Sequence, residues 1–222
     1  MNRVHPSGPD ARRPDAPRPD AVVFDIGNVL IEWDPDRAYT AMVGPERARA
    51  MFAAADIHRM NEAVDRGADF RETVYEAAEA TPDFRDEIRM WHDRWLEVAG
   101  PEIPHSVRLL RALRAKGVAV FALSNFGRGP FAVAEEAWPF LTEFDRRYIS
   151  GHLGVIKPAA RIYEILEEDS GIAPERLLFA DDMAYNIATA EARGWQTHLF
   201  EGPEGWAARL VEAGLLSSEE AR

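Results

Sequence analysis

Chemically active side chains follow three short apolar stretches of this chain. The acid Asp25 ends the first stretch, Ser124 and Asn125 end the second, and the acids Asp181 and Asp182 end the third. A carboxylate can attack phosphorus or carbon and form a covalent intermediate. Hydroxyl, amide and backbone N–H groups can hold phosphate oxygens, and paired carboxylates suit Mg2+. Together these residue types favour phosphoryl transfer, in which positioning and charge stabilisation provide most of the catalysis.

A lysine joins this set at Lys157, in the segment Gly154-Val155-Ile156-Lys157-Pro158. Pro158 suits the first position of a helix, so we expect Lys157 beside the positive N-terminal end of a helix. There its ammonium could neutralise a bound anion. Such a lysine by itself is most often a solvated charge, and it is the combination with the acids that indicates a site.

A parallel sheet would bring these side chains together. The apolar stretches are rich in β-branched and aromatic residues, which is typical of buried strands, and from Pro104 onward strands alternate with helices. This alternation predicts an α/β fold, a Rossmann-like, doubly wound parallel sheet with helices on both faces. Ligands bind at the carboxyl edge of such a sheet. We expect strands near 22–25, 118–123, 147–150, 176–180 and 196–200, and helices over 106–117, 131–138, 159–169, 184–193 and 203–213.

Two other parts of the chain differ in composition. Residues 1–20 contain five prolines among Arg and Asp, which predicts a disordered tail with order beginning near Ala21. Residues 36–100 show helical periodicity and no expected strand, and predict a small all-helical domain with helices over 70–80 and 84–99. Residues 21–35 and 101–222 then form the α/β core.

Within the helical domain no motif identifies a binding residue. Trp91 and Trp95 lie on one helical stripe and are expected in its core. His58, Asn61 and the segment Asp65-Arg66-Gly67 could line the pocket side of this domain, but we expect them on a solvated helix face.

Composition narrows the class of function. The 222 residues carry 26 basic and 38 acidic side chains, a net charge of -12, which argues against a nucleic-acid partner and an anionic membrane surface. A small anionic substrate remains compatible, because a site can be locally positive on an acidic protein. The absence of cysteine excludes thiol catalysis and disulfides. The apolar runs are too short to span a bilayer and the N-terminus lacks a signal core, so we expect a cytoplasmic protein. Its oligomeric state stays open between a monomer and a homodimer.

The order of these motifs resembles the haloacid dehalogenase-like hydrolase superfamily. The resemblance covers about residues 21–200 and rests on four motifs: Phe24-Asp25-Ile26-Gly27-Asn28-Val29-Leu30, Leu123-Ser124-Asn125, Lys157-Pro158, and Phe179-Ala180-Asp181-Asp182 with Asn186. The helical insert between the first and second motifs resembles the small cap domain of that family. Bacterial sugar-phosphate phosphatases are the most similar in motif, because they too carry Asp-x-Gly-Asn-Val at the first motif.

The resemblance implies a role for each motif. Asp25 would be the nucleophile, and Lys157 would orient it and neutralise charge. Ser124 and Asn125 would bind the transferred group. The remaining roles concern the metal: Asp25, the backbone carbonyl of Gly27 and Asp182 would hold Mg2+, with Asp181 and Asn186 in support.

One position departs from the family pattern. Phosphatases of the superfamily usually carry a second Asp two residues after the nucleophile, where it acts as acid and base, and here that position is Gly27. The difference predicts a slow phosphatase, another acid or a different reaction, because acid–base help typically contributes ~10²–10⁴-fold.

Three functions therefore remain open. The first is a Mg2+-dependent phosphatase that acts on a small phosphorylated metabolite through an aspartyl-phosphate. The second is a 2-haloacid dehalogenase, in which Asp25 attacks carbon and expels halide without metal. That branch generally has an aromatic residue at the position of Gly27 and no acidic pair, so the pair Asp181-Asp182 favours the phosphatase. The third is a non-catalytic binding or regulatory protein with the same fold.

Overall fold

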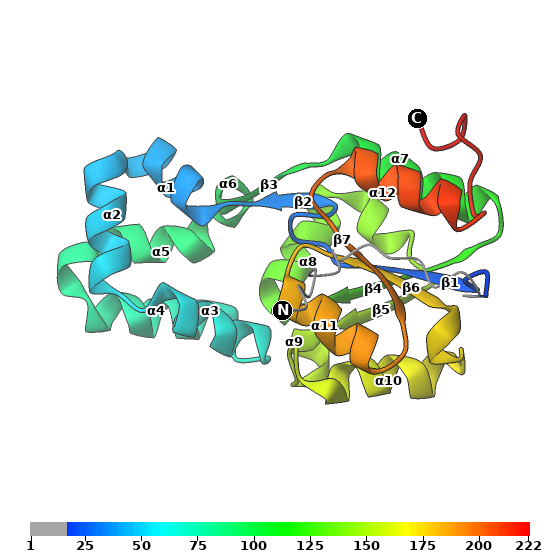
Figure 1. Ribbon diagram of the computed structural model, residues 1–222. Helices are drawn as coiled ribbons and strands as arrows, with labels where there is room; N and C mark the ends of the chain where they lie inside the picture. Colours follow the sequence, from blue (N-terminus) through cyan, green and yellow to red (C-terminus); the bar gives the residue numbers. More distant parts are fainter. Residues whose placement is uncertain (1–16) are drawn as a thin grey trace, which may run out of the picture.

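Parallel strands form the centre of the larger lobe (Figure 1). The computed structural model describes residues 17–222. The five strands lie in the order β5-β4-β1-β6-β7, and all four pairings between them are parallel. The strands are β1 (Ala21–Phe24), β4 (Ala119–Ser124), β5 (Arg146–Ile149), β6 (Leu177–Asp181) and β7 (Gln196–Leu199). Because β1 is the middle strand and is covered on both faces, all four of its residues are buried, which explains its uniformly apolar sequence.

Helices cover both faces of this sheet. Val22 and Phe24 of β1 point to one face and Val23 to the other, since successive side chains alternate along a strand. The first face is covered by α7 (Pro104–Ala115), α8 (Arg128–Ala137) and α12 (Pro203–Glu212), and the second by α10 (Ala160–Ser170) and α11 (Ala184–Ala192). Figure 1 shows α7 and α12 above the sheet and α10 below it. The predicted Rossmann-like, doubly wound α/β fold with helices on both faces is confirmed.

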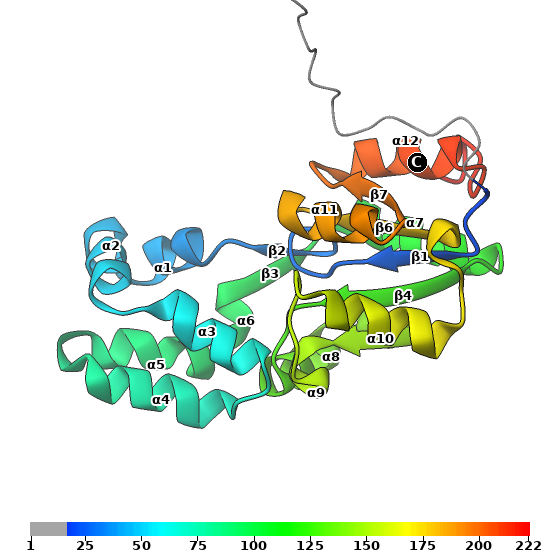
Figure 2. The same ribbon diagram turned by 60° about the horizontal axis from the view of Figure 1, so that its bottom comes forward.

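A second lobe of helices extends to one side of the sheet (Figures 1 and 2). The chain enters and leaves it through an antiparallel pair of strands, β2 (Ile31–Trp33) and β3 (Ala99–Glu102). Trp91 and Trp95 are buried in an apolar core that belongs to this lobe, as expected. Its helices are α1 (Pro35–Val43), α2 (Pro45–Ala54), α3 (Ile57–Asp65), α4 (Phe70–Ala80), α5 (Arg85–Asp93) and α6 (Trp95–Val98).

Local sequence explains where several of these helices begin. Asp34, Asp56 and Asp69 precede α1, α3 and α4, and each side chain accepts a hydrogen bond from the backbone N–H three residues further on. This contact satisfies one of the donors left unpaired in the first helical turn. Short segments complete the described chain: the 3₁₀ turns Pro82–Phe84, Pro139–Thr142 and Pro174–Arg176, and the helix α9 (Ser150–Leu153).

Two predictions about local structure were wrong. The helix predicted over 84–99 is divided at Arg94 into α5 and α6, and a strand, β3, begins at Ala99 because Ala99 pairs with Trp33 of β2. Pro158 is not the first residue of a helix, since α10 begins at Ala160. At Ala99 the pairing with a distant strand overrode the local helical periodicity, and at Pro158 a short turn comes before the helix begins.

The predicted tail, residues 1–20, lies mostly outside the described part of the chain, which begins at residue 17. Of the four residues that precede Ala21, three are bonded to the core, and the first of them, Pro17, accepts from Gln196 Nε2 through its carbonyl. Asp20 donates its backbone N–H to the carbonyl of Arg176 over 2.8 Å and pairs with the Arg176 guanidinium. The Arg18 side chain donates to the carbonyl of Gly214 over 3.1 Å. These contacts hold the residues just before Ala21 against the core.

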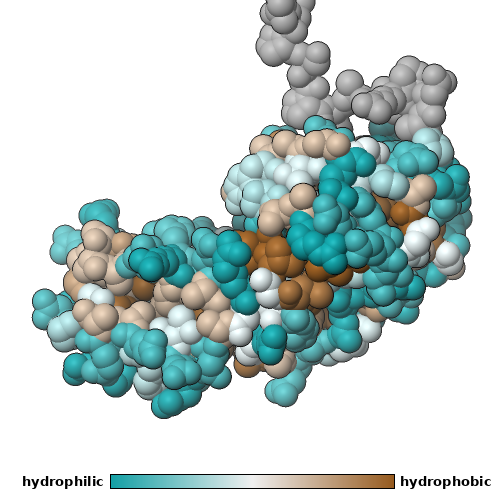
Figure 3. Space-filling model, turned by 90° about the horizontal axis from the view of Figure 1, so that it is seen from below, coloured by the Kyte–Doolittle hydropathy of each residue, from teal (hydrophilic) through white to brown (hydrophobic). Residues whose placement is uncertain are grey.

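Surface character is mixed over the two lobes. Seen from below, the surface is mostly hydrophilic, and a hydrophobic area lies on the larger lobe beside its junction with the helical lobe (Figure 3). Among the described helices, none combines the length and the apolar character needed to cross a membrane.

Candidate active site

The predicted polar residues meet at one edge of the sheet. Strands β4 and β6 lie on either side of β1, so the carboxyl ends of these three strands are adjacent. The registers pair Phe24 with both Ala122 and Ala180, which places Asp25 next to the ends of both neighbouring strands. Asp25 continues this alignment, because its backbone N–H donates to the carbonyl of Ala180 over 2.9 Å.

Asp25 is buried and held through both of its carboxylate oxygens. Oδ1 accepts hydrogen bonds from the Ser124 hydroxyl and from the Ile26 N–H, each over 2.7 Å. Oδ2 lies 2.9 Å from the Nζ of Lys157. Burial raises the pKa of Asp25 to about 7; the positive charge of Lys157 opposes this increase, and the nearby charge of Asp181 adds to it. The carboxylate is thus oriented as a nucleophile must be, and a nearby cation would favour its ionised form.

Lys157 is buried between two carboxylates. Its Nζ donates to Asp181 Oδ2 over 2.6 Å and to the carbonyl of Leu123 over 2.9 Å, in addition to its contact with Asp25. Burial alone would lower the pKa of this ammonium, but Asp181 and Asp25 more than compensate, and the pKa is raised above its ordinary value. Lys157 is therefore a fixed positive charge beside the Asp25 carboxylate.

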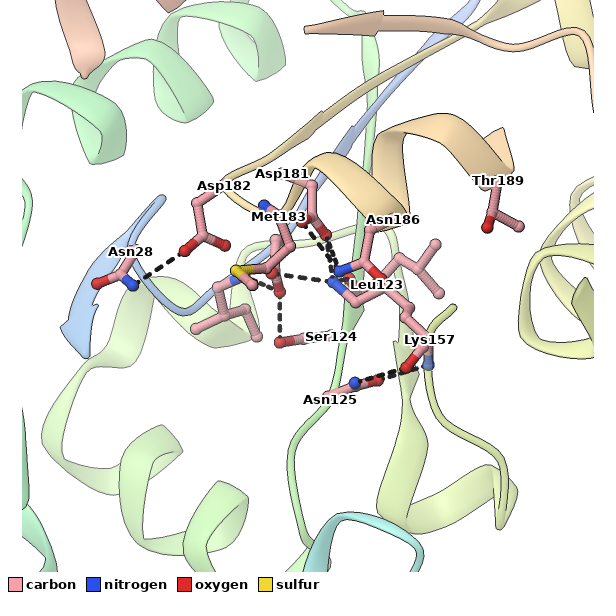
Figure 4. Close-up of polar contacts among 12 residues, drawn as sticks. Asn28, Leu123, Ser124, Asn125, Lys157, Asp181, Asp182, Met183, Asn186 and Thr189 are labelled. Atoms are coloured by element: carbon pink, nitrogen blue, oxygen red, sulfur yellow. Dashed lines mark hydrogen bonds and ion pairs between the residues drawn. The ribbon is translucent and has the colours of Figure 1, made fainter. Parts of the chain in front are cut away.

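Asn125 contacts the segment that carries this lysine. Its Oδ1 accepts from the Lys157 N–H over 2.7 Å, and its Nδ2 donates to the Lys157 carbonyl over 3.0 Å (Figure 4). Both ends of the amide are thus bonded to the main chain, which is a positioning arrangement. Ser124, by contrast, directs its hydroxyl to Asp25.

The acidic pair divides into an inner and an outer carboxylate. Asp181 is fully buried, and both of its oxygens accept hydrogen bonds from the Asn186 Nδ2 over 3.0 Å, in addition to bonds from Lys157 and from the N–H of Met183. Asp182 is only partly buried, and its Oδ2 accepts from Asn28 Nδ2 over 3.0 Å (Figure 4). Burial raises the pKa of Asp182, and the bond from Asn28 opposes this shift.

Asn28 belongs to the first motif, but its contact with Asp182 was not predicted. Its φ of 54° lies in the left-handed region, which Asn tolerates better than most residues. Its Oδ1 accepts from the Trp33 N–H over 2.8 Å while its Nδ2 holds Asp182. The pair Gly27-Asn28 predicts a turn after the strand, but only the fold brings Asp182 to this side chain.

A group of oxygen atoms at this edge fits a divalent cation. Ligand atoms of Asp25, Asp181 and Asp182 all lie within 4.8 Å of one another. Two backbone hydrogen bonds flank Gly27. The Ile31 N–H donates to the Ile26 carbonyl, and the Asn28 N–H donates to the Ile31 carbonyl, so neither bond uses the carbonyl of Gly27. Because the clustered donors are carboxylate oxygens, the set suits a hard ion that keeps several waters.

The helical lobe contacts the loop that follows β4. At the end of α3, Asp65 was expected on a solvated face, but its backbone carbonyl accepts from the Ser150 hydroxyl over 2.7 Å. The same hydroxyl accepts from the Phe126 N–H over 2.8 Å, two residues after Ser124. Asp65 therefore faces the core, and the solvated position expected for it was wrong. The helical pattern of α3 did not reveal this contact because the partner lies 85 residues away.

Comparison with protein families gives one broad match. A sequence model described as haloacid dehalogenase-like hydrolase matches residues 19–194. A curated relative is D-ribitol-5-phosphate phosphatase from Bacteroides thetaiotaomicron, which is 25% identical over 204 residues that cover 86% of this chain and 96% of that protein.

Solved structures share the same architecture. A haloacid dehalogenase family enzyme from Bacteroides thetaiotaomicron, solved as a magnesium complex, has a TM-score of 0.68 at 20% identity and covers 87% of this chain and 98% of its own. The L-2-haloacid dehalogenase from Xanthobacter autotrophicus, with chloropropionic acid covalently bound, has a TM-score of 0.57 at 19% identity and covers 89% and 84%. A magnesium-bound member of the family and a dehalogenase thus share this fold, and the fold alone does not identify the reaction.

Proposed function

The chain belongs to the haloacid dehalogenase-like hydrolase family, and within it we propose that this hydrolase is a Mg2+-dependent phosphatase that acts on a small phosphorylated metabolite. The observation that carries the proposal is the group of three carboxylates, Asp25, Asp181 and Asp182, around a single buried lysine. When ionised, these groups leave an excess of negative charge that would repel a phosphate dianion. A divalent cation removes that obstacle, whereas displacement of halide from a carbon atom would gain nothing from the additional acids.

Three oxygen donors would hold the cation. We assign them to the carboxylates of Asp25 and Asp182 and to the backbone carbonyl of Gly27, because Asp181 is already bonded to Lys157 and Asn186 through its two oxygens. Bound there, Mg2+ supplies charge neutralisation for the phosphoryl group. Asn28 would orient Asp182 through its amide.

The side chains of the site then divide the reaction between them. Asp25 attacks phosphorus and forms an aspartyl-phosphate, while the Ser124 hydroxyl and the Ile26 N–H keep its carboxylate in one orientation. Lys157 offsets the developing negative charge from a fixed position. Ser124 and Asn125 face the transferred group or support the residues that do. Water releases phosphate from Asp25 and restores the carboxylate.

Substrate selection, in this proposal, depends on both lobes. We assign residues 36–100 to a cap and residues 21–35 and 101–222 to the catalytic core, with the site at the sheet edge that faces the cap. The curated relative that acts on D-ribitol 5-phosphate supports polyol or sugar phosphates as the substrate class. Lining residues of the cap, rather than the four motifs, would choose among such substrates.

A substrate screen tests this proposal. Phosphate release from a panel of polyol, sugar and other phosphomonoesters is measured with Mg2+ and with EDTA, and halide release from 2-haloacids is measured in parallel. We expect phosphate release that EDTA abolishes and excess Mg2+ restores. Halide release that survives EDTA, without phosphate release, would support the dehalogenase instead; the absence of both activities would support a binding protein.

A further inference from the structure

Hydrolysis of an alkyl phosphate ester needs a proton donor for the leaving oxygen, and the residues at the sheet edge do not supply one. An alkoxide is a poor leaving group, so a positioned acid must protonate the oxygen as the P–O bond breaks. Gly27, two residues after the nucleophile, has no side chain to do this. The nearby acids have other partners: Asp181 is bonded to Lys157 and Asn186, and Asp182 is bonded to Asn28 and assigned to the metal.

A fourth carboxylate approaches the site from the cap. Asp65 is the last residue of α3, and its carboxylate lies beside the backbone N–H of Gly127, in the loop that follows Ser124. Its Oδ2 accepts from Asn61 Nδ2 over 2.9 Å. Its backbone carbonyl accepts from the Ser150 hydroxyl, which in turn accepts from the N–H of Phe126, two residues after Ser124. Asp65 is therefore a cap residue held directly against the substrate-binding loop.

Close packing keeps α3 in this position. A Cβ atom added to Gly127 would lie 2.4 Å from Val64 Cγ1, and one added to Gly67 would lie 2.7 Å from the carbonyl oxygen of Gly151. Both distances are shorter than van der Waals contact, so only glycine lets the backbones of cap and core approach this closely. The junction leaves Asp65 little freedom to move away from the loop.

The surroundings of Asp65 favour a protonated carboxyl near neutral pH. Burial raises its pKa to about 7; the Gly127 N–H and Lys157 oppose this rise, and Glu62 adds to it. The other charged groups at this junction are Arg66, whose guanidinium pairs with Glu62, and Arg128, which donates to the carbonyl of Gly151. Asp65 as a residue is only partly buried, which is compatible with proton exchange with a bound substrate.

We propose that Asp65 is the general acid and base of this hydrolase, supplied by the cap in place of a group at Gly27. The inference rests on the proposed phosphatase function. As Asp25 attacks phosphorus, the electron pair of the breaking P–O bond moves to the leaving oxygen, which takes the proton of Asp65 and departs as an alcohol. The Asp65 carboxylate then accepts a proton from the water that attacks the aspartyl-phosphate. Phosphate leaves, and both acids return to their starting states.

The first test compares leaving groups in the variant Asp65→Asn. The rate of the first turnover is measured with an alkyl phosphomonoester from the screen and with p-nitrophenyl phosphate, whose leaving group needs no proton. We expect alcohol release to slow by about 10²–10⁴-fold. The variant should still release p-nitrophenol in a rapid burst of one equivalent per enzyme, followed by slow turnover because hydrolysis of the aspartyl-phosphate has lost its base.

A matched control variant and a rescue variant test the role of Asp65 without relying on the comparison with p-nitrophenyl phosphate. Asp86→Asn removes a carboxylate from an exposed position of the same lobe, with 87% of its side chain accessible, and should not change either rate. In Asp65→Asn, adding Gly27→Asp should restore alkyl phosphate turnover. A Cβ at Gly27 would lie 3.8 Å from Trp33 Cβ, which is ordinary contact, so the first atom of the new side chain meets no clash.

Contrary outcomes separate the two proposals. If Asp65→Asn keeps the wild-type rate with the alkyl ester, or slows the first turnover equally for both leaving groups, Asp65 is not the acid. Failure of Gly27→Asp to improve the alkyl rate of the variant would count against it as well. A wild-type enzyme that releases no phosphate from any ester in the presence of Mg2+ would instead overturn the phosphatase function itself.

Discussion

The side-chain amide of Asn125 makes two hydrogen bonds to the main chain of Lys157. Its Oδ1 accepts from the backbone N–H of Lys157 over 2.7 Å, and its Nδ2 donates to the backbone carbonyl of Lys157 over 3.0 Å. The two residues lie 32 positions apart in the chain. This clamp fixes the backbone from which the Lys157 side chain reaches Asp25 and Asp181. The positive charge of Lys157 is thus positioned by the amide of Asn125, a residue that the family resemblance assigned to binding of the transferred group.

Replacing the nucleophile should abolish the reaction and leave the fold intact. In Asp25→Asn the amide keeps the shape of the carboxylate but cannot attack phosphorus, so we expect phosphate release to fall by roughly 10³-fold or more. Steady-state phosphate release measures the activity, and circular dichroism measures folding. Turnover close to that of the wild type would remove Asp25 from the nucleophile position.

Replacing the buried lysine should destabilise the protein. Lys157→Met leaves Asp25 and Asp181 buried without their cation, and breaking a buried ion pair in this way costs about 3–5 kcal/mol. Urea unfolding measures the free energy. The chain has one other lysine, Lys116, which is exposed and pairs with Glu220; Lys116→Met should change the stability by no more than about 0.5 kcal/mol. Equal effects at the two positions would contradict this account of the buried pair.

Weakening the proposed metal site should change the Mg2+ requirement. Asp182→Asn removes one anionic ligand while Asn28 can still bond to the side chain. We expect the Mg2+ concentration for half-maximal phosphate release to rise by about 10–100-fold. A titration of activity with Mg2+, with Asp86→Asn as the matched control, tests this. An unchanged titration curve would show that Asp182 is not a ligand.

The pH dependence of stability should report Asp65. Because burial raises its pKa from 3.8 to about 7, the folded chain keeps a proton between these values that the unfolded chain has released. The stabilising contribution of this group is complete at low pH and is lost as the pH rises through that range. Relative to Asp65→Asn, whose amide does not titrate, the wild type should therefore lose stability from about pH 4 to about pH 7. Urea unfolding in EDTA at several pH values measures the difference, and parallel curves would contradict a raised pKa.

Much of the core could be predicted because its signals are local. An apolar strand that ends on Asp25, and another that ends on Ser124, are visible in a few residues each, and parallel strands place such ends at one edge. The acids Asp181 and Asp182 follow the same rule at β6. Less could be predicted for the cap, where Ala99 joins a strand because it pairs with Trp33 far away in the chain.

By itself, the sequence determined the α/β class, the motifs and the types of group that gather at the site, because hydrophobic periodicity and turn residues act over short stretches. Only the tertiary structure decided which atoms meet. It paired Asn125 with Lys157 and Asn28 with Asp182, and it brought Asp65 from the cap to Gly127. Such contacts depend on how whole helices and strands pack, which no local pattern encodes. The position that lacks an acid, Gly27, is plain in the sequence, whereas the carboxyl proposed to replace it is visible only where cap and core touch.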